Sequence, residues 1–565
     1  MRRTGNNYIM LSMILAFLAI FLVWPMAYVF KRSFIDAKGF TLFYFGSLIS
    51  DPLQMEAIWT SFFIAVFVTI VSIMIASPMA WLVARRSFPG KTLISAFILL
   101  PMILPPFVGA VGMKMIFSRC GALSTLLMNL GATDEPIDWL GAYPLFGVVL
   151  LEALHLYPIL YLNLVASFAN IDPSLEESAA NLGATPWRIF RRVILPLAAP
   201  GIFAGTIIVF IWSFTELGTP LVFGMRRVLP VMIYDSVSEV GTNPAGYAQV
   251  VLLLVVAAAG FWISKRLTGS GKNIATLGRI TVVREEKKMS AGQMLAVYVF
   301  FGLVIFVSVI PHISVLMLAS SSRWFLTVLP ENFTAEFFKR AVGSEVTQTA
   351  LLNSLSLSLC ASIIDLFIGF TIAWLCVRRR IIGAGLLDTL AMLPLAVPGI
   401  IIAFGYLGCF GGFLNDRFSF LNPRVNPMAL LAVSYAIRRL PYMVRAAHSG
   451  LEQTSPVYEE AAANLGASPL RVVLRVTCPL IAANLLAGGI LCFAFSMLEV
   501  SDSLILAQAD QYFPITKAIY ALMDSLENGA NIASALGVWG MALLAAALLW
   551  ASFLLGKRLG QMFRI

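Results

Sequence analysis

The segment DPSLEESAANLGATPWRIFRRVILPL, residues 172–197, occurs again in altered form as SPVYEEAAANLGASPLRVVLRVTCPL, residues 455–480. The two copies are identical at 15 of 26 positions when they are aligned at a constant offset of 283. Unrelated segments would share about one or two identities at ordinary residue frequencies. The chain is therefore an internal duplication, and this segment is where its two copies differ least.

The duplication extends beyond the repeated segment on both sides. The offset of 283 also matches Pro158 with Pro441, Phe210 with Phe493, Ser213 with Ser496 and Glu216 with Glu499. Further upstream the offset becomes 293, and it matches Ser61 with Ser354, Trp81 with Trp374, Gly90 with Gly383 and Pro101 with Pro394. The first half thus carries ten extra residues, which we place in the loop containing Asp134, Glu135 and Asp138.

Each copy of the segment has the sequence of a short polar helix-turn-helix. An N-cap residue followed by proline opens the first helix, and an acidic pair in its first turns suits the positive end of the helix dipole. Gly183 and Gly466 predict left-handed caps at its other end. Ser/Thr-Pro then opens a second helix at once, followed by a basic turn. The paired signals are Asp172-Pro173 and Thr185-Pro186 in the first copy, and Ser455-Pro456 and Ser468-Pro469 in the second.

The composition indicates that lipid is the solvent for most of the chain. Of its 565 residues, 59% are apolar and 12% are charged, with a mean hydropathy of +0.87, whereas soluble proteins are about a quarter charged. A bilayer-crossing helix needs about 20 mostly apolar residues. Twelve such spans are predicted, near 9–30, 62–84, 94–117, 145–169, 202–225, 246–264, 293–318, 349–376, 387–412, 428–448, 480–506 and 534–556.

The basic residues predict the orientation of these spans. With both ends in the cytoplasm, 23 Lys and Arg residues lie in inside segments and 12 in outside loops, which favours N-in and C-in. We therefore interpret the net charge of +10 as a topology signal and expect no nucleic-acid partner. Because each half has an even number of spans, the copies are parallel. The predicted domains are residues 1–264 and 291–565, joined by a cytoplasmic linker, residues 265–290.

The repeated segment resembles the EAA loop of ABC importer permeases. That pattern has Glu-Ala-Ala, three residues, Gly, nine residues, then a hydrophobic residue, any residue, Leu and Pro. The copies read Glu177-Ser178-Ala179, Gly183, Val193, Leu195, Pro196 and Glu460-Ala461-Ala462, Gly466, Val476, Cys478, Pro479. Ser178 and Cys478 depart from the pattern. A different interpretation is that these are ordinary cytoplasmic turns kept by a recent duplication, but the apolar spans have diverged far more than the loops.

The resemblance covers nearly the whole chain and implies its architecture. The chain is similar to fused binding-protein-dependent inner membrane components of the type I fold, in the group that imports ferric iron, thiamine or aminoethylphosphonate. It is then an all-α integral membrane protein, with twelve transmembrane helices as two parallel six-helix type I ABC permease domains. The implied location is the bacterial inner membrane. The implied partners are lipid, two cytoplasmic ATP-binding subunits and a periplasmic solute-binding protein.

The resemblance also implies which residues couple the chain to the ATP-binding subunits. Each loop would insert a short helix into one such subunit. The coupling residues would be Glu176, Glu177, Ala179, Gly183, Pro186, Arg188, Glu459, Glu460, Ala462, Gly466, Pro469 and Arg471.

The sequence predicts a transport subunit without catalysis of its own. No Gly-x-x-x-x-Gly-Lys-Ser/Thr phosphate loop occurs, and Gly90-Lys91-Thr92 is only a fragment of one. ATP and Mg²⁺ would therefore be bound by partner subunits, with no cofactor in this chain. The six cysteines form no Cys-x-x-Cys pair, so neither a disulfide framework nor a metal site is expected.

Charged residues inside the predicted spans are candidates for the translocation path. Arg438 and Arg439 fall midway along the tenth span, where a cation costs at least about 2.5 kcal/mol and needs a cavity or a partner. Glu216, Glu499 and Asp502, on the fifth and eleventh spans, are candidate partners. The arginines either meet an anionic or chelated substrate or fix the packing of helices, and the sequence leaves both interpretations open.

The cargo follows only from the resemblance, which favours ferric iron. Importers of 2-aminoethylphosphonate, thiamine or polyamine are alternatives of the same class. A secondary transporter driven by an ion gradient could also have twelve spans in parallel repeats. Such a transporter has no need of two matched cytoplasmic loops, so we expect an ATP-driven importer.

Overall fold

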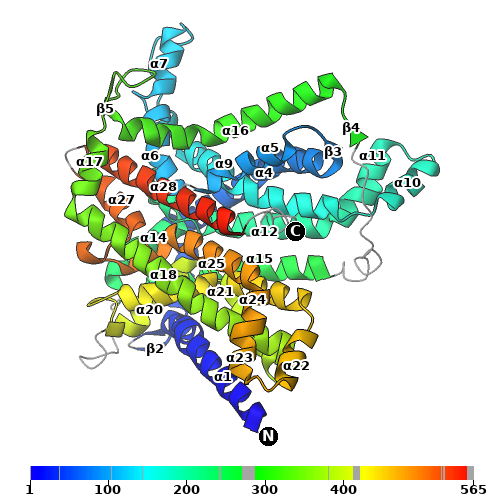
Figure 1. Cartoon of the computed structure of the whole chain (residues 1–565). Helices are drawn as coiled ribbons and strands as arrows, with labels where there is room; N and C mark the ends of the chain where they lie inside the picture. The colour runs from blue at the N-terminus through cyan, green and yellow to red at the C-terminus, as the bar shows by residue number, and fades with distance from the viewer. Residues whose placement is uncertain are drawn as a thin grey trace. The chain divides into compact units, whose positions relative to one another are not determined.

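The computed structural model describes residues 2–36, 38–103, 105–142, 144–240, 243–269, 287–379, 381–411, 420–523, 525 and 528–555 (Figure 1). The chain forms two compact units. One unit, called unit 1, comprises Met1–Asp51, Met232–Leu254 and Glu336–Phe563. The other, called unit 2, comprises Pro52–Val231, Val255–Ala335 and Arg564–Ile565.

Unit 2 holds most of the first half of the sequence. Its elements are α4 (Pro52–Arg85), β3 (Arg86–Ser87), α5 (Lys91–Ile98), η2 (Leu100–Ile103), α6 (Pro106–Phe117), α7 (Ala122–Asn129), α8 (Trp139–Ala142), α9 (Pro144–Ala169), α10 (Pro173–Asn181), α11 (Pro186–Ile189), η3 (Phe190–Ile194), α12 (Leu195–Phe214), α13 (Gly218–Val222), β4 (Lys287–Lys288), α16 (Ala291–Ala319), β5 (Ser321–Arg323) and β6 (Asn332–Phe333). Strands β3 and β4 pair in parallel, and β5 and β6 pair antiparallel. Two helices continue across the unit boundaries, α14 (Leu229–Asp235) and α15 (Ala245–Gly269).

Unit 1 holds most of the second half together with the N-terminal span. Its elements from the first half are α1 (Arg2–Leu18), η1 (Ala19–Val23), α2 (Trp24–Phe34), the antiparallel strands β1 (Ile35–Asp36) and β2 (Gly39–Phe40), α3 (Phe43–Ser50) and η4 (Ser236–Glu239). Those from the second half are α17 (Glu336–Gly343), α18 (Glu345–Trp374), η7 (Leu375–Arg379), α19 (Ala384–Met392), η8 (Leu393–Leu395), α20 (Gly399–Gly411), α21 (Met428–Gln453), α22 (Val457–Asn464), α23 (Pro469–Val472), η10 (Val473–Thr477), α24 (Cys478–Leu480), α25 (Ala482–Met497), α26 (Ser501–Leu506), η11 (Asp510–Tyr512), α27 (Ile515–Met523) and α28 (Gly529–Leu555).

The helices confirm the predicted all-α membrane fold. Within the described residues, eight helices are long and apolar enough to cross a membrane, and three bent helix pairs raise the number to eleven. The helix α21 is 26 residues long but contains Arg438, Arg439 and Arg445, so it is not purely apolar. With α21 counted, each of the twelve predicted spans has a helix or a bent helix pair.

The third and ninth predicted spans are not continuous helices, which corrects the prediction. The third breaks between Met102 and Pro106 with a bend of 88°, and the ninth breaks between Leu395 and Gly399 with a bend of 102°. Proline explains both breaks, because its ring removes a backbone donor and clashes with the preceding turn. The relevant residues are Pro101, Pro105 and Pro106 in the first half, and Pro394 and Pro398 in the second.

The same three-helix core recurs in each unit. In unit 2, α4, α9 and α12 pack together, and in unit 1 their sequence counterparts α18, α21 and α25 do the same. The matched serines Ser61 and Ser354 have the same role. The Ser61 hydroxyl accepts a hydrogen bond of 2.8 Å from the backbone N of Leu229, and the Ser354 hydroxyl accepts one of 2.7 Å from the backbone N of Ile515. The duplicated sequence has therefore kept its local packing.

The first span of each half packs on a broken span from the other half. In unit 1, α2 packs on α20, where a Cβ at Gly405 would lie 3.1 Å from the Pro25 carbonyl oxygen. In unit 2, α16 packs on α6, where a Cβ at Gly112 would lie 3.0 Å from the Pro311 carbonyl oxygen. The compact units therefore differ from the sequence halves. Since residues 270–286 of the predicted linker lie outside the described part, the boundaries at 264 and 290 remain a prediction.

Candidate functional site

The first repeated loop folds as the predicted helix-turn-helix of α10 and α11, which stand away from the other helices of unit 2 in Figure 1. The Asp172 carboxylate caps α10 by accepting a hydrogen bond of 2.9 Å from the backbone N of Ser174. Gly183 adopts φ +79°, and the N–H groups of Gly183 and Ala184 donate to carbonyls of the last turn at 2.9 and 3.0 Å. These two bonds form a Schellman cap, so the predicted left-handed stop is confirmed.

The second loop repeats this geometry with α22 and α23. Helix α22 begins at Val457, one residue later than the Ser455-Pro456 signal predicts. The backbone N–H of Val457 donates to the Ser455 hydroxyl at 3.4 Å. Gly466 has φ +83°, and the same pair of backbone hydrogen bonds closes the helix at 3.0 and 3.1 Å. A π-helical turn follows each loop at matched positions, η3 and η10. Single π turns inside helices occur frequently at functional sites.

An ion pair joins the base of each loop to the end of the second span of its half. Arg85, at the end of α4, donates to the Glu176 carboxylate on α10. Its counterpart Arg378, in η7, donates to the Glu459 carboxylate on α22 at 2.9 Å. Arg378 also donates to the carbonyl and hydroxyl oxygens of Thr454, both at 2.9 Å. These four side chains are 4–18% exposed, so each loop is joined to an earlier helix by an ion pair that solvent screens only partly.

Sequence analysis identified the two glutamates but not their arginine partners. Arg85 and Arg378 are two of the 23 inside Lys and Arg residues that indicate the orientation of the spans, and the offset of 293 matches one with the other. Each also ends a span that carries a matched tryptophan. The Arg85 guanidinium lies 4.8 Å from the centre of the Trp81 ring, while in the second copy Arg379 lies 4.4 Å from Trp374. The repeated offset between charged residues was the signal that could have revealed these pairs.

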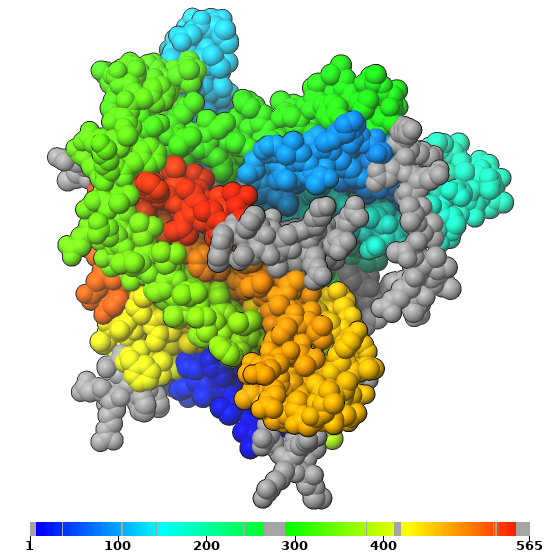
Figure 2. Space-filling model, in the orientation of Figure 1, coloured from blue at the N-terminus to red at the C-terminus, as the bar shows by residue number. Residues whose placement is uncertain are grey.

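The tips of the loops expose apolar side chains at matched positions. Leu182 is 89% exposed and Leu465 is 90% exposed, and Trp187 and Leu470 are both 68% exposed. In Figure 2 the second loop, in yellow and orange, forms a rounded lobe on its unit. Among the predicted coupling residues, Glu176, Ala179, Glu459 and Ala462 are half-buried, whereas Glu177, Gly183, Pro186, Arg188, Glu460, Gly466, Pro469 and Arg471 are exposed.

Arg438 and Arg439 lie near the middle of α21 and share one carboxylate. Arg438 pairs with Oε1 of Glu499 and Arg439 with Oε2. Arg439 also donates to the carbonyl of Phe495 at 3.0 Å, and Arg438 lies 3.6 Å from the carboxylate of Asp502. The expected pairing of these arginines with Glu499 and Asp502 is therefore present. Both acids follow α25 rather than lying on it, since Glu499 is in a turn and Asp502 is in α26.

A family model described as the binding-protein-dependent transport system inner membrane component matches residues 73–269 and again residues 365–564. The chain belongs to this family. Each match contains one of the two repeated loops. The permease is thus a duplicated member, in agreement with the resemblance in its sequence.

Curated relatives extend over most of the permease. It is 27% identical to a putative ferric transport system permease of Haemophilus influenzae over 90% of this chain and 79% of the relative. It is 24% identical to a ferric transport system permease of Actinobacillus pleuropneumoniae over 98% of this chain and 79% of the relative. A molybdenum transport system permease of H. influenzae is 31% identical over 38% of this chain and 95% of its own length.

Two further acids, Asp365 and Glu216, have different partners. Asp365, on α18, is fully buried beside Arg439 and Cys492, and sequence analysis missed it. A lone acid within the apolar run of α18 was the available signal. Glu216, predicted as a partner of the arginines, belongs to unit 2 and caps α13 instead. Its carboxylate accepts from the backbone N of Gly218 at 3.1 Å and of Thr219 at 3.4 Å.

Proposed function

We propose that this ABC importer permease is driven by two cytoplasmic ATPase subunits, one docked on each repeated loop, and receives cargo from a periplasmic solute-binding protein. The observation that carries the proposal is the pair of matched loops, each stiff at its base and apolar at its tip. The family supports the binding-protein-dependent class. The orientation that suits this function is N-in and C-in, which the distribution of Lys and Arg favours.

The exposed tips suit insertion into a groove on another protein. Leu182 and Leu465 leave almost their entire side chains in solvent although both lie in polar loops. Burying a leucine side chain contributes about 1.5–3 kcal/mol, so each tip offers a small apolar anchor. Glu177 and Glu460 are exposed beside these anchors and are available for polar contacts with the partner.

The bases of the loops suit the transmission of force. Glu176 is held by Arg85 at the end of α4, and Glu459 by Arg378 in η7, which continues α18. These helices belong to the three-helix core of their units. A displacement of a docked loop would therefore move a long membrane helix rather than only a flexible connection. Alternating access would follow from such movements in the two halves.

For the cargo, we propose ferric iron. The support is the similarity to two ferric transport permeases over 90% and 98% of this chain. Aminoethylphosphonate, thiamine and polyamine remain alternatives within the importer class. The molybdenum relative adds an oxyanion as a specific further candidate, although its similarity covers only 38% of this chain.

We assign different roles to the two arginines of α21. Arg439 is the less exposed and joins α21 to the end of α25 through Glu499 and the Phe495 carbonyl, which suits a packing role. Arg438 is more exposed and lies against Gly399, where a Cβ would come within 2.5 Å of its guanidinium carbon. The bend of the ninth span therefore leaves room for this cation, and Arg438 is the better candidate for the translocation path.

The docking proposal is tested by placing a charge on both tips. In proteoliposomes that contain the permease, its binding protein and its ATPase subunits, Leu182→Asp with Leu465→Asp should abolish vanadate-sensitive uptake and co-purification of the ATPase. A matched control is Leu130→Asp, which changes a leucine that is 71% exposed outside the loops. Normal uptake in the double variant, or uptake driven by an ion gradient without ATP, would contradict the proposal.

A further inference from the structure

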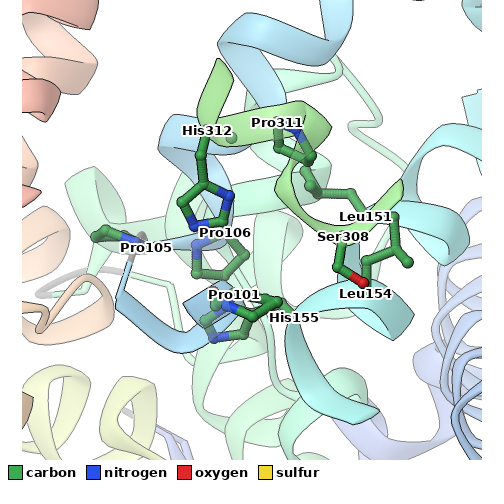
Figure 3. Close-up of a pocket in the computed structure, with 10 residues that line it drawn as sticks. Pro101, Pro105, Pro106, Leu151, Leu154, His155, Ser308, Pro311 and His312 are labelled. Carbon is green, nitrogen blue, oxygen red and sulfur yellow. The ribbon is translucent and has the colours of Figure 1, made fainter. Parts of the chain in front are cut away.

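A cavity lies at the bend of the third span in unit 2 and is lined by two histidines (Figure 3). Its volume accessible to the centre of a water molecule is about 10 Å³, close to the least that holds one water. The cavity therefore accepts a single small particle. Its polar and proline lining consists of Pro101, Pro105, Pro106, His155, Ser308, Pro311 and His312.

His155 approaches the cavity from α9 with its ring oriented by the backbone. Its Nδ1 lies 2.9 Å from the carbonyl oxygen of Pro101. Since a carbonyl only accepts, Nδ1 carries the proton and Nε2 keeps its lone pair in the neutral ring. Histidines that bind metals through one nitrogen almost always donate the other N–H to a carbonyl, carboxylate or water. The bend of the third span thus supplies the partner that such a ligand needs.

His312 approaches the same cavity from α16, and in Figure 3 its ring projects toward the prolines. Both ring nitrogens are buried, and neither makes a hydrogen bond of good geometry. The carbonyl of Ser308, one turn earlier, lies beside the ring. A buried polar group without a well-formed hydrogen bond costs about 1–3 kcal/mol, so an occupant that binds a nitrogen of His312 would relieve that cost.

Proline and glycine hold the walls of the cavity in place. Gly112 lets α6 approach α16 so closely that a Cβ there would lie 2.9 Å from the Val315 backbone N. Pro311 lies inside α16 directly before His312, and Pro158 lies inside α9 three residues after His155. Because Pro158 has no N–H, the carbonyl of Leu154, another lining residue, lacks its helical donor.

The equivalent place in the second half has different chemistry. The offset of 283 matches His155 with Arg438, and the offset of 293 matches Pro106 with Gly399. There the bend is occupied by a guanidinium paired with Glu499. A guanidinium is always charged and has no lone pair to donate. Unit 2 instead presents two imidazoles, His155 from the first half of the sequence and His312 from the second, and imidazoles donate lone pairs to first-row transition metals.

We propose that His155, through Nε2, and His312, through one ring nitrogen, transiently bind a first-row transition-metal cation on its way through the permease. This inference rests on the proposed transport function and identifies the class of its cargo. Two protein ligands are fewer than the four of a structural metal site. A site that must also release its ion requires binding weak enough for exit, and water would complete the coordination.

The chain itself provides a sharp test because it contains three histidines in total. The full permease, purified without a histidine tag and placed in lipid nanodiscs, is titrated with Zn²⁺, a diamagnetic ion that imidazole binds well. Binding is measured by equilibrium dialysis and by the ¹⁵N resonances of labelled histidine side chains. His448, on the same chain but 3.6 Å from the exposed Glu452, supplies the matched control.

The expected result is one Zn²⁺ per chain that shifts the resonances of His155 and His312. His155→Asn keeps a donor for the Pro101 carbonyl but lacks Nε2, and it should weaken binding at least about tenfold, as should His312→Asn. His448→Ala should leave binding unchanged. Binding that survives both Asn variants, or that His448→Ala alone removes, would overturn the site.

The ATPase is absent from this titration, so the test is separate from that of the proposed function. Zn²⁺ binding that depends on both histidines, with uptake insensitive to vanadate, would retain the site and refute the importer proposal. Vanadate-sensitive uptake that is unchanged in His155→Asn and His312→Asn, for every metal tested, would refute the site and retain the importer.

Discussion

Replacing Glu459 by Gln tests whether the loops are held rigidly at their bases. Glu459→Gln keeps the size of the side chain but removes the charge that Arg378 meets at 2.9 Å. Both side chains are largely buried, at 10% and 17% exposure, so solvent screens the pair only partly. A hydrogen bond to a charged group contributes about 1.5–3 kcal/mol, and this amount changes an equilibrium about ten- to a hundredfold.

The expected effect is local and appears in two assays. Amide hydrogen exchange in α22 should accelerate by about ten- to a hundredfold, because the open state of the loop becomes more populated. The amount of cargo imported per ATP hydrolysed should fall in reconstituted vesicles, while the amount of permease inserted stays constant. Arg378 keeps its bonds to Thr454, so the helix end before the loop should remain ordered.

Two further variants decide the interpretation. Exchanging the charges, with Arg378→Glu and Glu459→Arg together, should restore part of the coupling that either single change removes. The control Glu336→Gln breaks an exposed pair with Arg340 on α17, which is worth about 0.3–0.5 kcal/mol, and should change neither assay. Wild-type exchange and coupling in Glu459→Gln would refute the reasoning.

Three other outcomes are expected. In the double variant Gly183→Val with Gly466→Val, an added Cβ meets no atom within 4 Å, so only the left-handed backbone lowers the stability of each loop, by about 1–2 kcal/mol per site. Uptake should fall while the amount of inserted permease stays the same, and normal uptake would count against a rigid loop. Arg439→Met leaves the buried Glu499 with one partner fewer and should lower thermal stability by about 3–5 kcal/mol, whereas Arg438→Met should mainly change the Michaelis constant for uptake; equal effects of both would contradict the assigned roles. Burial lowers the pKa of Lys517 to about 8, so between about pH 8 and 10.5 the unfolded chain binds more protons than the folded chain, and the free energy of unfolding should rise with pH. Lys517→Met should show no such rise in thermal unfolding. A pH profile identical to that of the wild type would refute the role given to Lys517.

Local signals in the sequence were sufficient to predict the helices and caps of the two repeated loops. The caps at Asp172 and Gly183 depend on residues within a few positions, so the sequence determines them. The ion pairs of Arg85 and Arg378 join residues 91 and 81 positions apart. These pairs form only when the end of the second span lies beside the loop that follows the fourth span, and the periodicity of the sequence does not encode that arrangement. Only the repeated offset between the halves indicated them.

The number of membrane spans was predicted from the sequence, but their bends and their packing were not. An average hydropathy over the third and ninth spans conceals their bends, although Pro105 and Pro398 lie at the breaks. The packing of α2 on α20 and of α16 on α6 joins opposite halves of the sequence, and no pattern along the chain predicts it. For the same reason His155 and His312, 157 positions apart in the sequence, could not be associated before the structure was known.

The central claim is that the two loop tips contact ATP-hydrolysing subunits. A photoreactive amino acid placed at Leu182, and separately at Leu465, in intact cells tests this most directly, because both positions are exposed at the tips. The account predicts a cross-link from each position to an ATPase subunit and protection from reagents added outside the cell. Labelling from the outside, or cross-links at both positions that never include an ATPase, would contradict it.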